Sequence, residues 1–300
     1  MTAFIVYTST STDSRAMIAN ATEEHAIDRW CASGLEAIEG GGCFAAPSAM
    51  GAAVPMVVYL HGRYGPDAID EEMDRQTRVM QRATAKGYAV LAMHGVQGEC
   101  SAPEMKDWWC WPSNERNASD APAFVTRIDE TIARARERIG VGPNVLLGFS
   151  NGGYFAELIA KRALARFDAI AIAHAGPVNV FFGDVPPARR ETPPILLVTA
   201  DDDISDIDMM QLDDELTRTR WPHAIVAREG GHALPDWDID SALVFFDRAR
   251  KEKLPFSPPL PTRSVRPRVV EAGTSVDDAS GEIGVDGGLD LRDLGGGADD

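Results

Sequence analysis

Ser150 is the residue of this chain whose surroundings are most typical of covalent chemistry. It stands in the pattern Gly148-x-Ser150-x-Gly152, after an apolar run over residues 144–149 and before an alanine-rich helical pattern. A sharp strand-to-helix turn of this kind lifts a serine hydroxyl clear of a sheet and leaves the N–H of the next residue, Asn151, at a helix N-terminus. The pattern therefore predicts a serine nucleophile. The alternative is a glycine-rich turn whose serine merely caps the helix.

A serine hydroxyl becomes a strong nucleophile only when an imidazole takes its proton. His232 follows two glycines at the carboxyl end of the last predicted strand, where it would reach the same sheet edge as Ser150. His223 begins that strand, at the opposite edge, and His174 ends the strand that closely follows the serine helix. We therefore expect His232 to be the base. Its alternative role is that of a loop histidine that caps the following helix.

The imidazole in turn needs a carboxylate that fixes its tautomer and stabilises its cation. Four aspartates follow the apolar strand at 194–199: Asp201, Asp202, Asp203 and Asp206. They lie between Ser150 and His232, and serine, acid, histidine is the chain order that accompanies a serine turn of this kind. The side-chain direction changes at each step along the chain, so at most one of the three adjacent aspartates faces His232. The others would cap the next helix or complement its dipole.

An oxyanion that develops on the substrate needs two hydrogen-bond donors near the serine. One is expected to be the backbone N–H of Asn151, and the other that of Arg63, in the loop after the apolar strand 54–60. Tyr64 could donate through its hydroxyl instead. The Arg63 side chain could meet an acidic substrate group, or could simply be a solvated surface arginine.

The substrate pocket is expected to involve the long segment 95–122, which lacks a clear periodicity and would fold over one edge of the sheet. It carries Trp108, Trp109 and Trp111. We predict that Tyr64, Trp109 and Trp111 line the pocket, although at least one tryptophan could merely pack the loop.

Strands and helices are predicted to alternate along the chain. Short apolar runs predict strands at 43–47, 54–60, 88–94, 144–149, 169–174, 194–199 and 223–228. Amphipathic patterns predict helices at 67–86, 123–139, 151–165, 206–219 and 239–251. Such alternation predicts an α/β fold with a mostly parallel, doubly wound sheet and helices on both faces. Ligand sites then belong at the carboxyl ends of the strands.

Four motifs together resemble the α/β-hydrolase superfamily over roughly residues 54–251: the His61-Gly62 loop, the Gly148 to Gly153 turn, the aspartates after Ala200, and Gly230-Gly231-His232. The resemblance implies the α/β-hydrolase fold. It favours Asp203 as the acid, because Ala200-Asp-Asp-Asp203 is similar to the family's Gly-x-x-Asp. The tryptophan loop and the cysteine pairs further resemble secreted esterases of the polyhydroxybutyrate-depolymerase and feruloyl-esterase type. No long insertion follows the sixth strand, so no large lipase-type lid is expected.

The composition restricts the partners and the location of the protein. Its 300 residues carry a formal net charge of -17, which argues against binding nucleic acid or an anionic membrane surface. No apolar run is long enough to cross a bilayer, and the first residues lack the features of a signal peptide. The four cysteines form two local pairs, Cys31 with Cys43 and Cys100 with Cys110. Disulfides there would favour a periplasmic or secreted protein, and free thiols a cytoplasmic one.

The chain is expected to consist of a poorly ordered arm at 1–28, one α/β-hydrolase domain at 29–253, and a disordered Pro/Gly/Asp-rich tail at 254–300. The expected function is a serine carboxylesterase that cleaves a small or medium ester, with no cofactor and no metal. A serine peptidase or an acyltransferase would use the same machinery. A non-catalytic binding module of the same fold is a further alternative.

Overall fold

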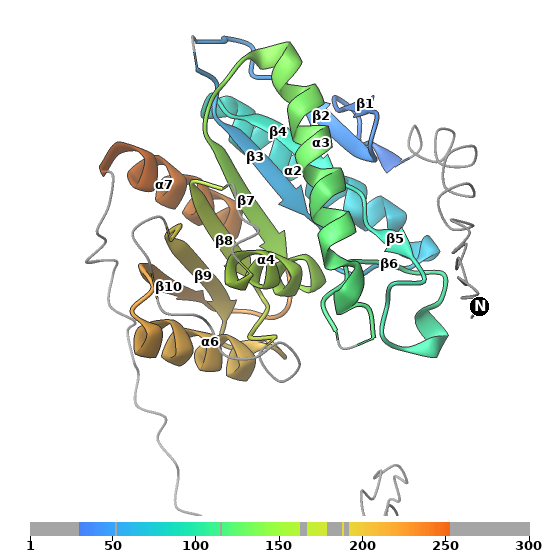
Figure 1. Cartoon of the computed structure of the whole chain (residues 1–300), viewed down its shortest axis with the longest axis vertical. Helices are drawn as coiled ribbons and strands as arrows, with labels where there is room; N and C mark the ends of the chain where they lie inside the picture. Colours follow the sequence, from blue (N-terminus) through green and yellow to red (C-terminus); the bar gives the residue numbers. More distant parts are fainter. Residues whose placement is uncertain are drawn as a thin grey trace, which may run out of the picture. The chain divides into compact units, whose positions relative to one another are not determined.

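One eight-stranded sheet organises the computed structural model, in the order β1-β2-β4-β3-β7-β8-β9-β10 (Figure 1). The structure describes residues 30–51, 53–114, 116–162, 167–178, 188 and 192–252. Strands β3, β4, β7, β8, β9 and β10 run parallel, whereas β1 and β2 form an antiparallel edge. The strand bounds are β1 Glu36–Ile38, β2 Gly42–Ala45, β3 Met56–Leu60, β4 Ala89–Met93, β7 Asn144–Phe149, β8 Ala169–Ala173, β9 Ile195–Ala200 and β10 His223–Arg228.

Helices cover both faces of this sheet. On one side lie α3, α4 and α6, the first two of which stand in front of the sheet in Figure 1, and on the other lie α2 and α7. The bounds are α2 Ile69–Ala85, α3 Ala121–Ile139, α4 Asn151–Lys161, α6 Asp206–Thr219 and α7 Asp236–Glu252. None of the helices in the described ranges is both long and apolar enough to cross a membrane.

Alternation along the central strands fills two apolar cores. In β3, Val58 points into the core beneath α3 and α4, and its neighbours Val57 and Tyr59 point into the core beneath α2 and α7. All five residues of β3 are buried. A parallel strand that is covered on both faces has a continuous apolar sequence, because the side chains on both faces of the sheet are removed from water.

The long connection from β4 to α3 folds into a small structure of its own. Strands β5 (Val96–Gln97) and β6 (Trp109–Cys110) pair antiparallel, and a disulfide joins Cys100 to Cys110. A second disulfide joins Cys31 to Cys43 and so ties the segment before β1 to β2, the second strand of the sheet. Two disulfides favour an extracytoplasmic location.

The predicted fold class is confirmed: the sheet is mostly parallel and helices lie on both of its faces. One helix boundary differs, since α7 begins at Asp236 rather than at 239. The turn 235–238 continues into the helix, and this places Asp238 beneath the sheet edge. The predicted arm and tail lie outside the described residues, and so does most of the connection from β8 to β9, where a lid would be inserted.

Candidate active site

Ser150 occupies a strained turn between β7 and α4. Its φ is 52° and its ψ is -120°, a conformation that residues other than glycine rarely adopt. The Ser150 N–H donates to the carbonyl of Ala173 on the neighbouring strand at 2.8 Å. Two glycines make the turn possible: a Cβ on Gly148 would lie 2.4 Å from the Gly152 carbonyl oxygen, and one on Gly152 would lie 2.3 Å from that of Leu60. Backbone strain of this kind persists where the surroundings hold it, and it clusters at functional sites.

The structure brings Ser150, His232 and Asp203 together in one chain of hydrogen bonds. The Oγ of Ser150 lies 2.9 Å from Nε2 of His232, and Nδ1 of His232 lies 2.9 Å from Oδ1 of Asp203. The three residues come from three loops, which follow β7, β10 and β9 at the carboxyl edge of the sheet. The carboxylate of Asp203 is fully buried, while the His232 side chain is 28% exposed. In this series of hydrogen bonds, the acid is therefore buried, and the serine lies at the end that is nearest to solvent.

The other three candidate acids lie elsewhere. Asp201 accepts the N–H of Gly230 at 2.8 Å, and Asp206 accepts the hydroxyl of Thr199 at 3.1 Å. Asp202 is exposed. Of the four candidates, Asp203 is the one that is bonded to His232.

Hydrogen bonds keep Asp203 ionised. Its burial favours the neutral acid, but the hydrogen bonds donated to its two oxygens outweigh that effect and hold the pKa of the carboxyl well below its usual range. The donors are the rings of His174 and His232 together with the backbone N–H and hydroxyl of Ser205, both of which are 2.7 Å from Oδ1.

The loop after β3 lies directly against the serine. A Cβ on Gly62 would be 3.1 Å from the Cβ of Ser150, so no larger residue fits there without displacement. The next residue, Arg63, and the residue after the serine, Asn151, both border the cavity in front of Ser150. Within the described part of the chain, no protein acceptor is bonded to the backbone N–H of Arg63 or of Asn151.

A buried histidine fixes this loop. His61 Nδ1 lies 2.5 Å from the Gly62 carbonyl, and its Nε2 lies 2.8 Å from the Gly95 nitrogen. Burial lowers the pKa of His61 to about 3, so the ring is neutral. It therefore donates from Nδ1 and accepts at Nε2. The indole of Trp111 donates to the His61 carbonyl at 2.9 Å and completes the attachment.

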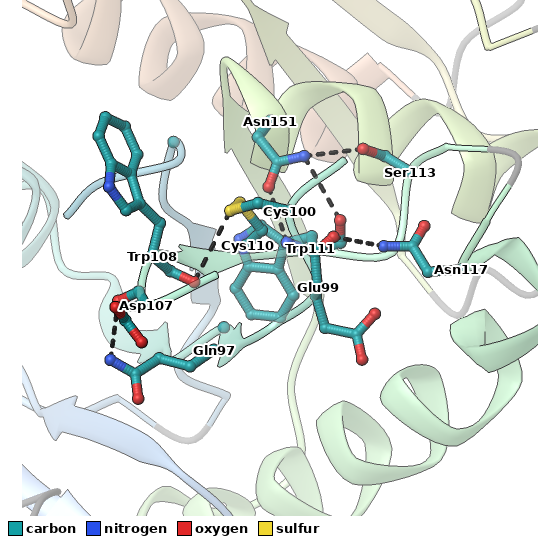
Figure 2. Close-up of a disulfide and its surroundings, with 12 residues drawn as sticks. Gln97, Glu99, Cys100, Asp107, Trp108, Cys110, Trp111, Ser113, Asn117 and Asn151 are labelled. Carbon is teal, nitrogen blue, oxygen red and sulfur yellow. Dashed lines mark hydrogen bonds between the residues drawn. A yellow bond between two sulfur atoms is a disulfide. The ribbon is translucent and has the colours of Figure 1, made fainter. Parts of the chain in front are cut away.

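The side chain of Asn151 anchors the long β4–α3 connection to the serine turn, as Figure 2 shows. Its Oδ1 accepts the N–H of Trp111 at 2.7 Å, and its Nδ2 donates to the hydroxyl of Ser113 at 2.7 Å. The Cys100–Cys110 disulfide lies beside these contacts. Asn151, which borders the cavity, thus also holds one wall of that cavity in place.

The cavity in front of Ser150 has a volume of about 310 Å³ and a lining of mixed polar and apolar character. Besides Ser150, Asn151 and His232, it is lined by Arg63, Glu99, Cys100, Ser101, Cys110, Ser113, Asn114, Tyr154, Ile204, Ser205 and Asp208. Tyr154 and Asp208 bond to each other at 2.8 Å on the wall formed by α4 and α6.

The predicted aromatic pocket is not the cavity that the structure shows. Tyr64, Trp109 and Trp111 are absent from its lining. Tyr64 and Trp111 are buried: the Tyr64 ring stacks on Trp109 at 5.1 Å, and Trp111 stacks on Phe155 at 5.6 Å. These rings pack the β4–α3 connection onto the sheet, because large apolar side chains in a long segment provide most of its stabilising burial.

Sequence reasoning missed three residues behind the acid: His174, Asp238 and Arg228. His174 directly follows β8, the strand next to the serine turn, and its position at that edge is the signal that could have found it. The ring atoms of His174 and His232 and the Asp203 carboxylate lie within 4.8 Å of one another. Each Asp203 oxygen faces a separate imidazole nitrogen, which is the pattern of hydrogen bonds, and we assign no metal ligand among them.

Comparison with known proteins relates the chain to others by structure alone. No family model and no curated protein matches its sequence. Esterase PE8 is 20% identical, with a TM-score of 0.51, and the match covers 70% of this chain and 98% of that one. The Bacillus cereus carboxylesterase is 14% identical over 79% of this chain and 100% of that one, with a TM-score of 0.50. A variant of Arabidopsis thaliana SOBER1 is 16% identical over 66% and 100% of the two chains, also at 0.50. The chain therefore has the fold of the α/β-hydrolase superfamily.

Proposed function

We propose that this protein is a serine hydrolase that cleaves carboxylic esters through an acyl-enzyme. The observation that carries the proposal is the unbroken chain of hydrogen bonds from Ser150 through His232 to Asp203, with its serine end at an open cavity. A nucleophile, a base and a carboxylate that orients the base are the parts that acyl transfer requires. The esterases of similar fold agree with this reaction class but do not by themselves assign it.

The first half of the reaction forms the acyl-enzyme. Ser150 Oγ attacks the ester carbonyl carbon while His232 Nε2 takes the hydroxyl proton, and Asp203 stabilises the resulting imidazolium. The carbonyl oxygen becomes an oxyanion, for which the N–H groups of Asn151 and Arg63 are the donors we assign. When the tetrahedral intermediate collapses, the bond to the alcohol oxygen breaks. His232 returns its proton to that oxygen, and the alcohol leaves.

The second half releases the acid. A water molecule takes the place of the alcohol, and His232 removes one of its protons as the oxygen attacks the acyl carbon. The same two N–H groups hold the second oxyanion. Collapse then breaks the bond to Ser150 Oγ, which recovers the proton from His232. The carboxylic acid leaves, and the enzyme returns to its starting state.

The cavity supports a small substrate. A volume of about 310 Å³ is at the lower end of the range for small-molecule sites. Its lining combines serine, asparagine, tyrosine and charged groups with apolar surfaces such as Ile204 and the Cys100–Cys110 disulfide. We therefore expect short acyl groups to react faster than long ones, because a cavity of this volume has little room for a long chain.

The test is a panel of p-nitrophenyl esters from acetate to octanoate, set beside aminoacyl p-nitroanilides and an alcohol acceptor. Wild type is expected to hydrolyse the short esters, and Ser150→Ala to lose about 10⁴-fold or more of kcat. The matched control is Ser48→Ala, an exposed serine that follows β2 at the opposite edge of the sheet. Amide cleavage or acyl transfer faster than ester hydrolysis would replace this proposal by a peptidase or acyltransferase. Silence of folded wild type on all substrates would reject it.

A further inference from the structure

The buried groups behind Asp203 form a second chain that the proposed reaction does not use. His174 is fully buried, and its Nδ1 is hydrogen-bonded to Asp203 Oδ2. Its Nε2 lies 2.8 Å from Oδ2 of Asp238, in the first turn of α7. Arg228, at the end of β10, closes the chain by donating from Nε to Asp238 Oδ1 at 2.8 Å. The residues at the ends of β8 and β10 and in the first turn of α7 thus form a continuous line of polar contacts from Asp203 to Arg228.

The protonation state of His174 follows from its partners. An ionised carboxylate only accepts hydrogen bonds, so an imidazole with a carboxylate oxygen at each nitrogen must donate from both nitrogens. The alternative is a neutral ring whose Nε2 accepts from Arg228 Nη2. That contact is 3.4 Å, and it would leave the Asp238 oxygen facing a lone pair at 2.8 Å. Because the contact between His174 Nε2 and Asp238 is the shorter of the two, we assign His174 as an imidazolium that donates to Asp238.

The charges agree with this assignment. With a protonated His174, the buried cluster holds two carboxylates, Asp203 and Asp238, and two cations, His174 and Arg228. With a neutral His174 it would hold one uncompensated buried negative charge, which is costly. Burial lowers the pKa of His174, but the hydrogen bonds that the ring donates to Asp203 and Asp238 outweigh it and raise the pKa above the usual value. Two aromatic rings of the described residues also pack against the His174 ring, those of Phe149 and His232, each at a centroid distance of 5.8 Å.

The backbone supports a role for His174 beyond packing. It has a φ of 55°, in the left-handed region, at a buried position that directly follows β8. Its own N–H remains in the sheet and donates to the Val198 carbonyl at 2.9 Å. His174 therefore keeps its backbone in the sheet despite the unusual φ, while its ring lies between Asp203 and Asp238. Backbone strain of this kind is common at functional sites.

We propose that His174 is a positively charged positioning residue of the ester hydrolysis assigned above, held between Asp203 and Asp238, which fixes the plane of the Asp203 carboxylate toward His232. The inference rests on the proposed function, since it needs a reaction in which His232 acts. His174 does not touch the substrate. It acts through Asp203, whose Oδ2 it occupies while Oδ1 is left for His232 and Ser205.

The first test reads the protonation state directly. Long-range ¹H–¹⁵N spectra of histidine-labelled wild type distinguish an imidazolium from either neutral tautomer. We expect both nitrogens of His174 to remain protonated at pH 8, and Asp238→Asn to convert the ring to a neutral tautomer. A neutral ring in wild type overturns the inference. The signal is assigned by its absence in His174→Asn, or by correlation to its own backbone if that variant does not fold.

The second test measures the effect on catalysis. Asparagine tolerates the left-handed φ, so His174→Asn keeps the backbone preference and removes the charge. If His174→Asn leaves Asp203 misplaced, we expect kcat to fall by about 10²-fold and KM to change by less than about 3-fold. Removing a cation 5.8 Å from His232 makes protonation of that ring easier, so the acid limb of kcat/KM moves to higher pH, by about 1–2 pH units.

The matched control is His223→Asn. His223 also pairs with an aspartate, Asp213 at 3.2 Å, and its pKa is also raised: burial opposes protonation, and this bond outweighs it. It lies at the amino end of β10, away from Ser150. We expect full activity and an unmoved acid limb from it. If His174→Asn behaves like His223→Asn in an active enzyme, the inference is wrong. If wild type hydrolyses no ester, the proposed function fails, while the spectra still decide the charge.

Discussion

A methyl group added to Gly152 is expected to disable the site without touching any polar side chain. The new Cβ would lie 2.3 Å from the Leu60 carbonyl oxygen and 2.6 Å from that of His61, both of them backbone atoms. Ordinary contact begins near 3.4 Å, so β3 and the first turn of α4 would have to separate by about 1 Å. That separation would move the N–H of Asn151 away from that of Arg63.

The expected magnitudes follow from this displacement. A shift of about 1 Å in a catalytic group costs about 10²-fold in rate. Forcing a methyl group into a packed site costs about 1–3 kcal/mol of unfolding free energy. We therefore expect Gly152→Ala to lose about 10²-fold in kcat for p-nitrophenyl acetate while remaining folded.

The control for Gly152→Ala is an alanine substitution at another glycine near the site, one whose surroundings have room for a Cβ. Gly231 precedes His232, and a Cβ there would meet only the Asp202 carbonyl oxygen at 3.6 Å, an ordinary contact. Gly231→Ala should keep kcat within about 3-fold of wild type, since it adds no overlap. Urea denaturation reports the stability of both variants. If Gly152→Ala is as active as Gly231→Ala, the close approach of β3 and α4 does not position the donors, and the reasoning is refuted.

Three further predictions concern the surroundings of the site. Asn151→Ala removes the anchor of the β4–α3 connection, so we expect faster proteolysis within residues 95–120 and a fall in kcat/KM of about 10-fold, and unchanged proteolysis would contradict this. Replacing both Cys100 and Cys110 by serine should lower the unfolding free energy by about 2–3 kcal/mol in urea titrations, a loss that reduction of wild type should match or exceed. Burial raises the pKa of Glu72 to about 7 despite its bond to Arg75, so the folded state holds a proton that the unfolded state loses above about pH 4.5. Its contribution to stability therefore falls as pH rises from about 4.5 to 7, and Glu72→Gln should remove that part of the pH dependence; an unchanged profile would show that Glu72 does not titrate there.

The fold and the main partners of Ser150 were accessible from sequence because both depend on local patterns. Apolar runs and helical periodicity locate the strands and helices, and the parallel topology then brings the residues that follow β7, β9 and β10 to one edge. The choice of Asp203 among its neighbours required more than the pattern, since adjacent aspartates differ only in side-chain direction. The resemblance to a known family supplied that choice.

The residues that sequence reasoning did not find depend on tertiary detail. His174 has an unusual φ that turns its ring under the sheet edge, and no local pattern predicts this. Asp238 stands just before the predicted start of α7, where an aspartate is normally a capping residue. The three aromatic residues expected in the pocket were misplaced for a related reason. Composition shows that a long segment contains tryptophans, but not which face of that segment packs on the core.

The most direct test of the proposed mechanism is covalent labelling of Ser150. We predict that a fluorophosphonate probe adds to folded wild type at one residue, that mass spectrometry of the digest places the adduct on Ser150, and that loss of esterase activity parallels its formation. Ser150→Ala should take up no label, and Ser48→Ala should be labelled at the wild-type rate. Folded wild type that hydrolyses esters while Ser150 remains unlabelled, or an adduct on another residue, would contradict the central claim.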